Sequence, residues 1–208
     1  MSTTLTAPEQ RVRLNNISWA TYQDLLRAHT DASVPRFTYD RGELEISSPS
    51  PEHEYLKDVT ALLVSIIAEP LEIDAEGFGS TTFHREDILR GFEPDACFYI
   101  ANLDRVKGKT KLDFNQDPPP DLVIEIDITH PSLPRFPILA EFGVPEVWRH
   151  DGEQLQIFCL EAGAYVQRDR SAALRGVTAE TLTELIGESR HLPRREWLCR
   201  IRERARAV

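Results

Sequence analysis

The chain has 208 residues, enough for one domain with a sizeable core, and its 41% hydrophobic and 28% charged residues are ordinary for a globular protein. Its formal net charge of −10 comes from 34 acidic and 24 basic residues and argues against broad, non-specific attraction to nucleic acid, because phosphate binding relies on Lys and Arg. No apolar run is long enough to cross a bilayer, and the amino-terminal segment lacks the basic and apolar regions of a signal peptide.

The amino-terminal part of the chain predicts a helix, a hairpin and a long second helix. Ser18 can cap a helix over residues 19–28, in which apolar side chains recur at helical spacing. Two alternating segments, 36–39 and 43–47, flank a turn sequence and predict a β-hairpin. Ser50 and the proline after it supply a cap and a first-turn residue for the long helix that follows.

The middle of the chain predicts strands separated by a polar loop. We expect short strands around Ile73 and over residues 79–83, and a further strand over residues 95–100. Residues 103–120 form a polar loop whose closing prolines stop any regular element. An apolar strand follows over residues 121–128.

The carboxy-terminal part predicts a helix, three strands and two final helices. Gly143 is a suitable cap for the end of a short helix, and Asp151-Gly152 is a strong hairpin signal. The expected elements are a helix over 133–142, strands over 147–150, 153–160 and 164–168, and helices over 179–186 and 194–205.

Together these elements predict a mixed α/β (α+β) domain with a central, partly antiparallel sheet. We expect a flexible lead over residues 1–15, a main domain over residues 16–170, and a helical extension over residues 171–208 that packs on or near the same domain. The three cysteines are far apart and show no zinc or redox spacing, so a reducing, cytoplasmic location is the simplest expectation.

Acidic residues stand in two apolar, strand-like segments. Glu125 and Asp127 lie two positions apart, so a strand points both carboxylates to one face and the neighbouring aliphatic side chains to the other. Asp95 follows a proline at the start of another such segment. Because buried charges are costly unless they are paired or bound to a cation, a divalent metal held among Asp95, Glu125 and Asp127 would explain the pattern, which indicates metal-dependent hydrolysis.

Five short segments occur in a specific order along most of the chain. They are YDRGEL (39–44), SPSPEH (48–53), PD (94–95), PPDLVIEI (119–126) and GVPEVW (143–148). Each segment is weak alone, but the ordered set is specific. With these segments the chain resembles the PD-(D/E)XK nuclease superfamily and is more closely similar to the Uma-two family of restriction endonucleases.

The resemblance implies a restriction-endonuclease-like fold, with a mixed central sheet flanked by helices, and hydrolysis of DNA assisted by Mg²⁺ or Mn²⁺. It implies that Asp95 is the metal-binding aspartate and that Glu125 is the second acidic ligand. The superfamily commonly has lysine two positions after that glutamate, where this chain has Asp127. In the Uma-two family a basic residue often lies instead eight positions before the glycine of the GVP segment, and here that residue is Arg135.

The basic residue at this position changes the chemistry that is available. Arginine stays protonated, so Arg135 is unsuited to act as a general base, but it can clamp a phosphate and stabilise developing charge. The attacking hydroxide would then come from metal-bound water, and oxygen ligands from the three carboxylates suit a hard cation. His53 or its neighbour Glu54, in the first turn of the long helix, could hold a metal-bound water or a second cation. Only one of them can face inward, and we favour His53.

Structural interpretations of the same residues stay open. Asp95 could pair with a nearby arginine such as Arg85 or Arg90, and the aspartate at the end of the acidic strand could sit in solvent. Arg135 could form a simple salt bridge to either carboxylate of that strand, and His53 could sit in solvent.

Three functions fit these observations. The leading one is a metal-dependent endonuclease acting on DNA as a homodimer, because two strands must be cut and symmetric pairs are the commonest oligomers. The alternative is a catalytically degenerate nuclease-fold module for binding or assembly, motivated by the missing lysine and the acidic net charge. A hydrolase of small phosphoesters is the third, weakened because the sequence has no Gly-rich phosphate loop. Assays of metal binding and DNA cleavage separate them.

Overall fold

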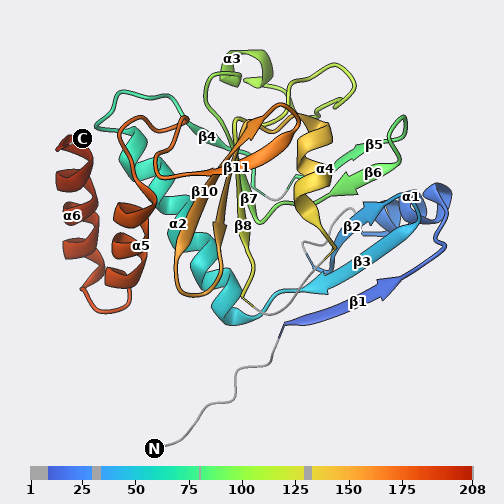
Figure 1. Cartoon of the computed structure of the whole chain (residues 1–208), viewed down its shortest axis with the longest axis horizontal. Helices are drawn as coiled ribbons and strands as arrows, with labels where there is room; N and C mark the ends of the chain where they lie inside the picture. Colours follow the sequence, from blue (N-terminus) through green and yellow to red (C-terminus); the bar gives the residue numbers. More distant parts are fainter. Residues whose placement is uncertain (1–8, 30–33, 80, 129–132, 208) are drawn as a thin grey trace, which may run out of the picture.

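The computed structural model describes residues 9–29, 34–79, 81–128 and 133–207. Its strands form two sheets, one of five strands and one of six, with helices packed beside them (Figure 1). The mixed α/β class predicted from the sequence is confirmed, but the strands are divided between two sheets. The helices are α1 (Trp19–Ala28), α2 (Pro51–Ala68), α3 (Leu103–Val106), α4 (Arg135–Phe142), α5 (Ala179–Glu188) and α6 (Arg194–Arg206).

The five-stranded sheet has the order β1-β3-β2-β6-β5, and its neighbouring strands are antiparallel. β2 and β3 form the predicted hairpin around Arg41 and Gly42, whose φ angles are 50° and 101°. Glycine adopts such a positive φ at little cost, and hairpin turns require it. Helix α1 packs on this sheet, where Tyr22 stacks on Tyr39 with the ring centroids 4.8 Å apart. The strands are β1 (Gln10–Leu14), β2 (Arg36–Asp40), β3 (Glu43–Ser48), β5 (Phe83–Arg85) and β6 (Arg90–Phe92).

The six-stranded sheet has the order β11-β10-β9-β8-β7-β4. Its central strands β8 and β9 are parallel, and α4 lies in the crossover between them, whereas the other neighbouring pairs are antiparallel. Gly143 ends α4 in the left-handed conformation, with φ at 77°, as the sequence predicts. The strands are β4 (Glu76–Gly77), β7 (Ala96–Tyr99), β8 (Leu122–Ile126), β9 (Glu146–His150), β10 (Leu155–Glu161) and β11 (Ala164–Arg168).

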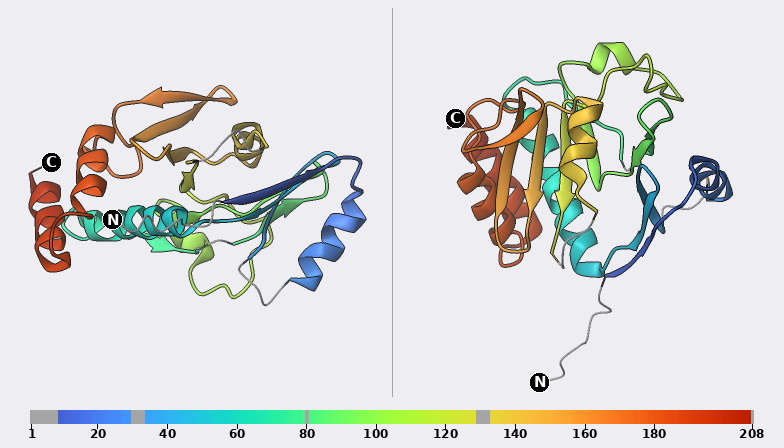
Figure 2. Two further views of the ribbon diagram at one scale, coloured as in Figure 1. Left: turned by 90° about the horizontal axis from the view of Figure 1, so that it is seen from below. Right: turned by 45° about the vertical axis from the view of Figure 1, so that its right-hand side comes forward.

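Strand β8 is buried on both faces, which explains why every residue in it except Glu125 is aliphatic. Leu122 and Ile124 belong to the hydrophobic cluster that includes α2, α5 and α6, whereas Val123 belongs to a second cluster that includes α4. Figure 2 shows α2 and α4 on opposite sides of this sheet. Burial of each aliphatic side chain stabilises the fold by about 1.5–3 kcal/mol. This packing fixes the strand that carries Glu125.

Helices α5 and α6 share the core of the six-stranded sheet. Trp197 and Ile201 of α6 and Leu185 of α5 are buried in the same cluster as the inner face of α2. The indole of Trp197 donates a hydrogen bond to the carbonyl of Leu185 at 2.7 Å. The segment predicted as a helical extension therefore packs on the main core. Within the part of the chain that the structure describes, no helix has both the length and the apolar character needed to cross a membrane.

Residues 10–14 form a strand, so the prediction of a flexible lead is wrong for them. β1 pairs with β3 from Gln10 opposite Ser48 to Leu14 opposite Leu44. Val12 and Leu14 remain 54% and 40% exposed, so the segment has no buried face that local periodicity could reveal. Its strand conformation depends on a partner far along the chain.

The middle of the chain also differs from the sequence prediction. The strands expected around Ile73 and over residues 79–83 are replaced by the short strands β4, β5 and β6. Helix α3 lies within the segment 103–120, which we expected to be a loop. Elements of two to four residues are too short to show a period, which explains these errors.

Candidate active site

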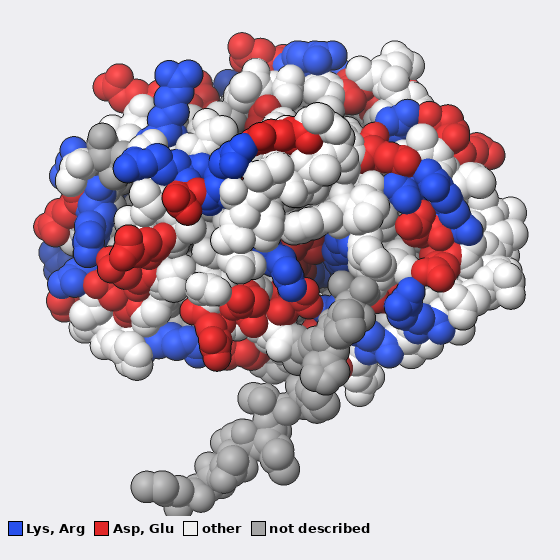
Figure 3. All heavy atoms as spheres, in the orientation of Figure 1, with Lys and Arg blue, Asp and Glu red and all other residues white. Residues whose placement is uncertain are grey.

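The carboxy-terminal end of β8 faces a cavity of about 340 Å³. Glu125 and Asp127 both line this cavity, as does Ile126 between them. Arg11 from β1, Arg135 from α4 and Arg149 from β9 also line it. The face of the molecule drawn in Figure 3 is hollowed near its centre, and both acidic and basic atoms are visible in the hollow.

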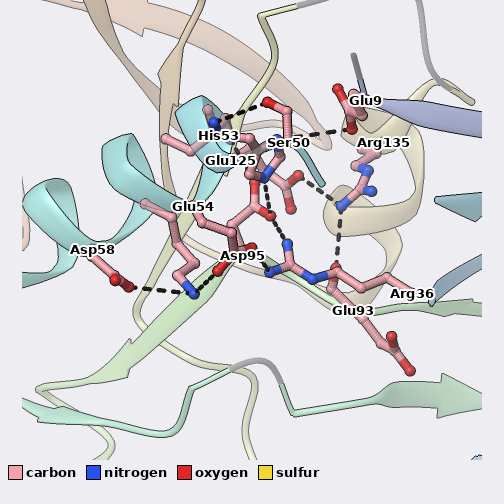
Figure 4. A network of polar contacts seen from close by, with 12 residues as sticks. Glu9, Arg36, Ser50, His53, Glu54, Asp58, Glu93, Asp95, Glu125 and Arg135 are labelled. Atoms are coloured by element: carbon pink, nitrogen blue, oxygen red, sulfur yellow. Dashed lines mark hydrogen bonds and ion pairs between the residues drawn. The ribbon is translucent and has the colours of Figure 1, made fainter. Parts of the chain in front are cut away.

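Asp95 directly precedes β7 and is almost completely buried, with 4% of its surface exposed. One carboxylate oxygen accepts the backbone N–H of Ile126 at 2.7 Å, which ties it to the end of β8. The other oxygen lies 2.7 Å from His53 Nε2 and forms an ion pair with Arg36 (Figure 4). Both oxygens of Asp95 therefore already have partners.

His53 lies inside the fold, so the interpretation that it sits in solvent is wrong. Its position follows from the start of α2, where Ser50 caps the helix and accepts the backbone N–H of His53 at 3.2 Å. Burial, and after it the positive charge of Arg36, lower the pKa of His53 from 6.5 to about 3. The ring is therefore neutral, and we assign its Nε2–H as the donor to Asp95. His53 Nδ1 is buried 3.8 Å from Glu9 and makes no hydrogen bond with a described residue.

Glu54, the alternative to His53, points away from the buried side of α2. Its side chain is 37% exposed and accepts a hydrogen bond from Arg36 at 2.8 Å. Lys57, one turn further along the helix, also pairs with it. The expectation that one of the two neighbours faces inward, and that this one is His53, is confirmed.

Glu125 and Arg135 form an ion pair at the cavity wall. Arg135 Nη1 donates to Glu125 Oε2 at 2.7 Å and to the backbone carbonyl of Glu93 at 3.2 Å. Burial raises the pKa of Glu125, and the positive charge of Arg135 opposes this rise most strongly. Glu125 Oε1 is buried and makes no hydrogen bond within the described part of the chain.

Asp127 lies just beyond β8 and is partly buried. Arg149 Nη2 donates to its Oδ2 at 2.8 Å, whereas its Oδ1 is buried without a hydrogen bond to any described residue. The interpretation of Asp127 as a residue that sits in solvent at the strand end is therefore wrong.

Arg36 is the partner of Asp95, and the sequence did not indicate it. Arg85 and Arg90, the partners considered from the sequence, pair with other aspartates. Arg36 begins β2 in the five-stranded sheet and reaches the end of the other sheet, so only the contact between the two sheets brings it to the site. Burial lowers the pKa of its guanidinium.

Arg11 is a second cation that sequence reasoning missed, because its segment was expected to be flexible. Its Nε and Nη2 lie 2.9 and 2.8 Å from Glu9 Oε1. Its Nη1 is buried, lies 3.9 Å from Glu45 Oε1 and makes no hydrogen bond to a residue that the structure describes. The antiparallel pairing of β1 with β3 places Arg11 beside the cavity.

The carboxylates predicted to hold a metal are each paired with an arginine. The pairs are Asp95 with Arg36, Glu125 with Arg135, and Asp127 with Arg149. Among the residues that the structure describes, no group of three His, Cys, Asp or Glu side chains is arranged to hold a metal ion. The premise that only a bound cation could compensate these charges is therefore wrong, because arginines from three other elements compensate them.

Two oxygens at the cavity nevertheless fit a hard cation. Glu125 Oε1 and Asp127 Oδ1 are both buried without a hydrogen bond to described residues, and both residues line the cavity. Carboxylate oxygens are the ligands that Mg²⁺ and Mn²⁺ prefer. Asp95 offers no free oxygen in this arrangement, so its role as a ligand stays a prediction.

Comparisons with known proteins agree with this fold. The family model described as "Uma2: Putative restriction endonuclease" matches residues 19–188. A solved structure described as "a putative nuclease belonging to DUF820 from Anabaena variabilis" is 16% identical, with a TM-score of 0.56, and the match covers 82% of this chain and 99% of that one. At this identity the likeness shows the fold alone. No curated protein matches the chain.

Proposed function

The chain belongs to the Uma2 family, and on that premise we propose that it is an endonuclease that hydrolyses phosphodiester bonds of DNA at the cavity beside Glu125. One observation carries this proposal. Glu125 is a buried carboxylate in a cavity, with one oxygen free of hydrogen bonds to described residues and the other bound to Arg135. Such a combination of burial, a specific charge partner and a cavity is typical of functional sites.

Arg135 would bind the phosphate that is attacked. Glu125 and the backbone carbonyl of Glu93 hold its Nη1 in place. Its second terminal nitrogen can donate to a non-bridging phosphate oxygen and stabilise the negative charge that grows during the reaction. Arg135 acts in this proposal as an electrostatic group and not as a base.

Glu125 and Asp127 would hold Mg²⁺ or Mn²⁺ through their free oxygens, with Asp95 as the further ligand predicted from the family resemblance. Such an ion would supply a nucleophile from water at neutral pH and offset charge on the phosphate. His53 is a positioning residue in this proposal, because it donates to Asp95 and does not line the cavity. Arg149 fixes Asp127 in the same way.

Cleavage assays with purified protein test this proposal. The protein is incubated with single-stranded and double-stranded DNA in Mg²⁺, in Mn²⁺ and in EDTA. We expect cleavage with either metal, and a loss of at least 100-fold in Glu125→Gln, because removal of one electrostatic group in an active site typically costs 10²–10³ in rate. Cleavage in EDTA would contradict the metal dependence.

The matched control is Glu43→Gln. Glu43 is an exposed glutamate of the hairpin and pairs with Arg13 at the surface, so its neutralisation should leave cleavage unchanged. Cleavage that persists in both Glu125→Gln and Asp95→Asn would show that another site, or a contaminant, is responsible.

A catalytically degenerate binding or assembly module is the second candidate. The observation that favours it is the pairing of all three predicted ligands with arginines. Titration of the protein with Mn²⁺ in a calorimeter separates the two functions. Binding that Glu125→Gln abolishes supports the endonuclease, whereas the absence of binding and of cleavage supports the module.

The homodimer also stays a prediction of the family resemblance. Light scattering at working concentration tests it directly. A mass twice that of the 23.7 kDa chain would support it, and the mass of a single chain would contradict it.

A further inference from the structure

Glu45 of β3 is a buried carboxylate close to Arg135. Only 1% of its surface is exposed, and it does not line the cavity beside Glu125. It therefore does not contact a phosphate or a metal ion that binds in the cavity. Burial of a charged carboxylate is costly unless the carboxylate is paired, so the groups around Glu45 indicate what it does.

One oxygen of Glu45 holds the chain where α4 begins. Glu45 Oε2 accepts the backbone N–H of Leu133 at 2.8 Å. Leu133 is fully buried and lies two residues before Arg135, the first residue of α4. Pro134, at the N-cap position of this helix, has no polar side-chain group that could cap it. The contact with Glu45 therefore ties the start of α4 to the five-stranded sheet, and a negative charge at this end also suits the helix dipole.

The other oxygen of Glu45 lies between two guanidinium groups. Glu45 Oε1 is 4.0 Å from Arg135 Nη2 and 3.9 Å from Arg11 Nη1. It is buried and makes no hydrogen bond to a described residue. A shift of about 1 Å would turn either ion pair into a charged hydrogen bond, which is typically about 2.7–2.9 Å long. Arg11 also pairs with Glu9 through its other nitrogens, so the two arginines share the charge of Glu45.

Arg135 needs a second anionic partner because Glu125 has another task in the proposed reaction. Arg135 Nη1 donates to Glu125 and to the backbone carbonyl of Glu93 (Figure 4). Glu125 would lose part of its hold on the guanidinium when it binds a metal ion, because its charge is then shared. Glu45 lies outside the cavity and keeps its charge for the arginines whatever the cavity binds.

We propose that Glu45 is a positioning residue for Arg135. It fixes the start of α4 through Leu133 and the plane of the guanidinium through Nη2, which leaves a further N–H of that nitrogen free to bind the phosphate. This role rests on the proposed endonuclease function and adds to it a residue that touches neither phosphate nor metal. A guanidinium fork needs a partner at each end, whereas a lysine ammonium is a single point charge, so the role requires arginine at position 135.

A double-mutant cycle separates this role from a contribution to folding. Glu45→Gln keeps an oxygen for the N–H of Leu133 but removes the charge that faces Arg135. We expect kcat for DNA cleavage to fall at least tenfold, with KM changed less than about threefold, because misplacement of a group by about 1 Å can cost roughly 10²-fold in rate. In the Arg135→Lys background the same substitution should change kcat less than about threefold. Equal losses in the two backgrounds would overturn the proposal.

Nitrogen NMR of the arginine side chains tests the same contact without DNA or metal. A guanidinium that is held at both ends rotates slowly about its Nε–Cζ bond, so Nη1 and Nη2 give separate signals. Arg135→Lys identifies the signals of Arg135. We expect separate Nη signals in the unchanged protein and one averaged signal in Glu45→Gln. Separate signals in Glu45→Gln, or an averaged signal in the unchanged protein, would overturn the proposal.

Glu43→Gln is the matched control for both experiments. Glu43 lies two residues before Glu45 on the same strand but pairs with Arg13 at the surface, so its replacement should change neither kcat nor the signals of Arg135. Equal losses in Glu43→Gln and Glu45→Gln would overturn the proposal.

Two further outcomes remain decisive. If circular dichroism shows that Glu45→Gln does not fold, Glu45→Asp takes its place in both experiments, with the same direction of change expected, because it keeps the charge but is shorter by one methylene group. If the unchanged protein cuts no DNA, the proposed function fails, and the NMR signals alone decide whether Glu45 holds Arg135.

Discussion

Replacement of Arg36 by methionine should strongly destabilise the fold. The side chains of Arg36 and Asp95 are only 7% and 3% exposed, and they form an ion pair. Without the guanidinium, the charge of Asp95 keeps only the hydrogen bonds from His53 and Ile126. Loss of one partner of a buried ion pair costs about 3–5 kcal/mol. That is a large part of the roughly 5–15 kcal/mol that stabilises a domain.

Urea denaturation followed by circular dichroism measures this cost. We expect the free energy of unfolding of Arg36→Met to fall by about 3–5 kcal/mol and the melting temperature by roughly 6–20 °C. Arg13→Met is the control, because Arg13 forms an exposed pair with Glu43 and should change stability by less than about 1 kcal/mol. In the double variant Arg36→Met/Asp95→Asn the two costs should not add, with a coupling of about 0.5–3 kcal/mol. A loss below about 1 kcal/mol in Arg36→Met would refute the reasoning that this arginine compensates the buried carboxylate.

Two further predictions concern packing and accessibility. Gly91→Ala should lower the free energy of unfolding by about 1–3 kcal/mol, because the added Cβ would lie 2.2 Å from the hydroxyl of Tyr22. The control is Gly187→Ala in α5, where the added Cβ meets no atom within 4 Å. In the same urea denaturation assay this control should be neutral or stabilising. Equal effects of the two substitutions would contradict the packing of α1 on the five-stranded sheet. Burial raises the pKa of the Cys97 thiol to about 12. A thiol reagent at pH 8 should therefore label the exposed Cys199 quickly and the buried Cys97 only when the protein unfolds. Mass spectrometry of the labelled peptides measures both rates. Rapid labelling of Cys97 in the folded protein would show that β7 is not buried as the structure places it.

The sequence could predict the parts of the site that depend on local geometry. The two-residue spacing of a strand brings Glu125, in β8, and Asp127, just beyond its end, to the same cavity. The cap at Ser50 and the hundred-degree step of a helix turn His53 inward and Glu54 outward. These features depend on residues within one turn or one strand, so the chain specifies them whatever its distant segments do.

Only the tertiary structure decided which charges compensate one another. Arg36 and Arg11 come from the five-stranded sheet, and neither strand shows in its own sequence that it will lie against the end of β8. The choice of Arg36 over Arg85 or Arg90 as the partner of Asp95 depends on how two sheets pack, which is a contact between segments far apart in the chain. A buried carboxylate requires a positive partner, and the sequence alone determines that requirement. Which cation meets it depends on long-range packing, because the interaction energy depends on distance in space and not on distance along the chain.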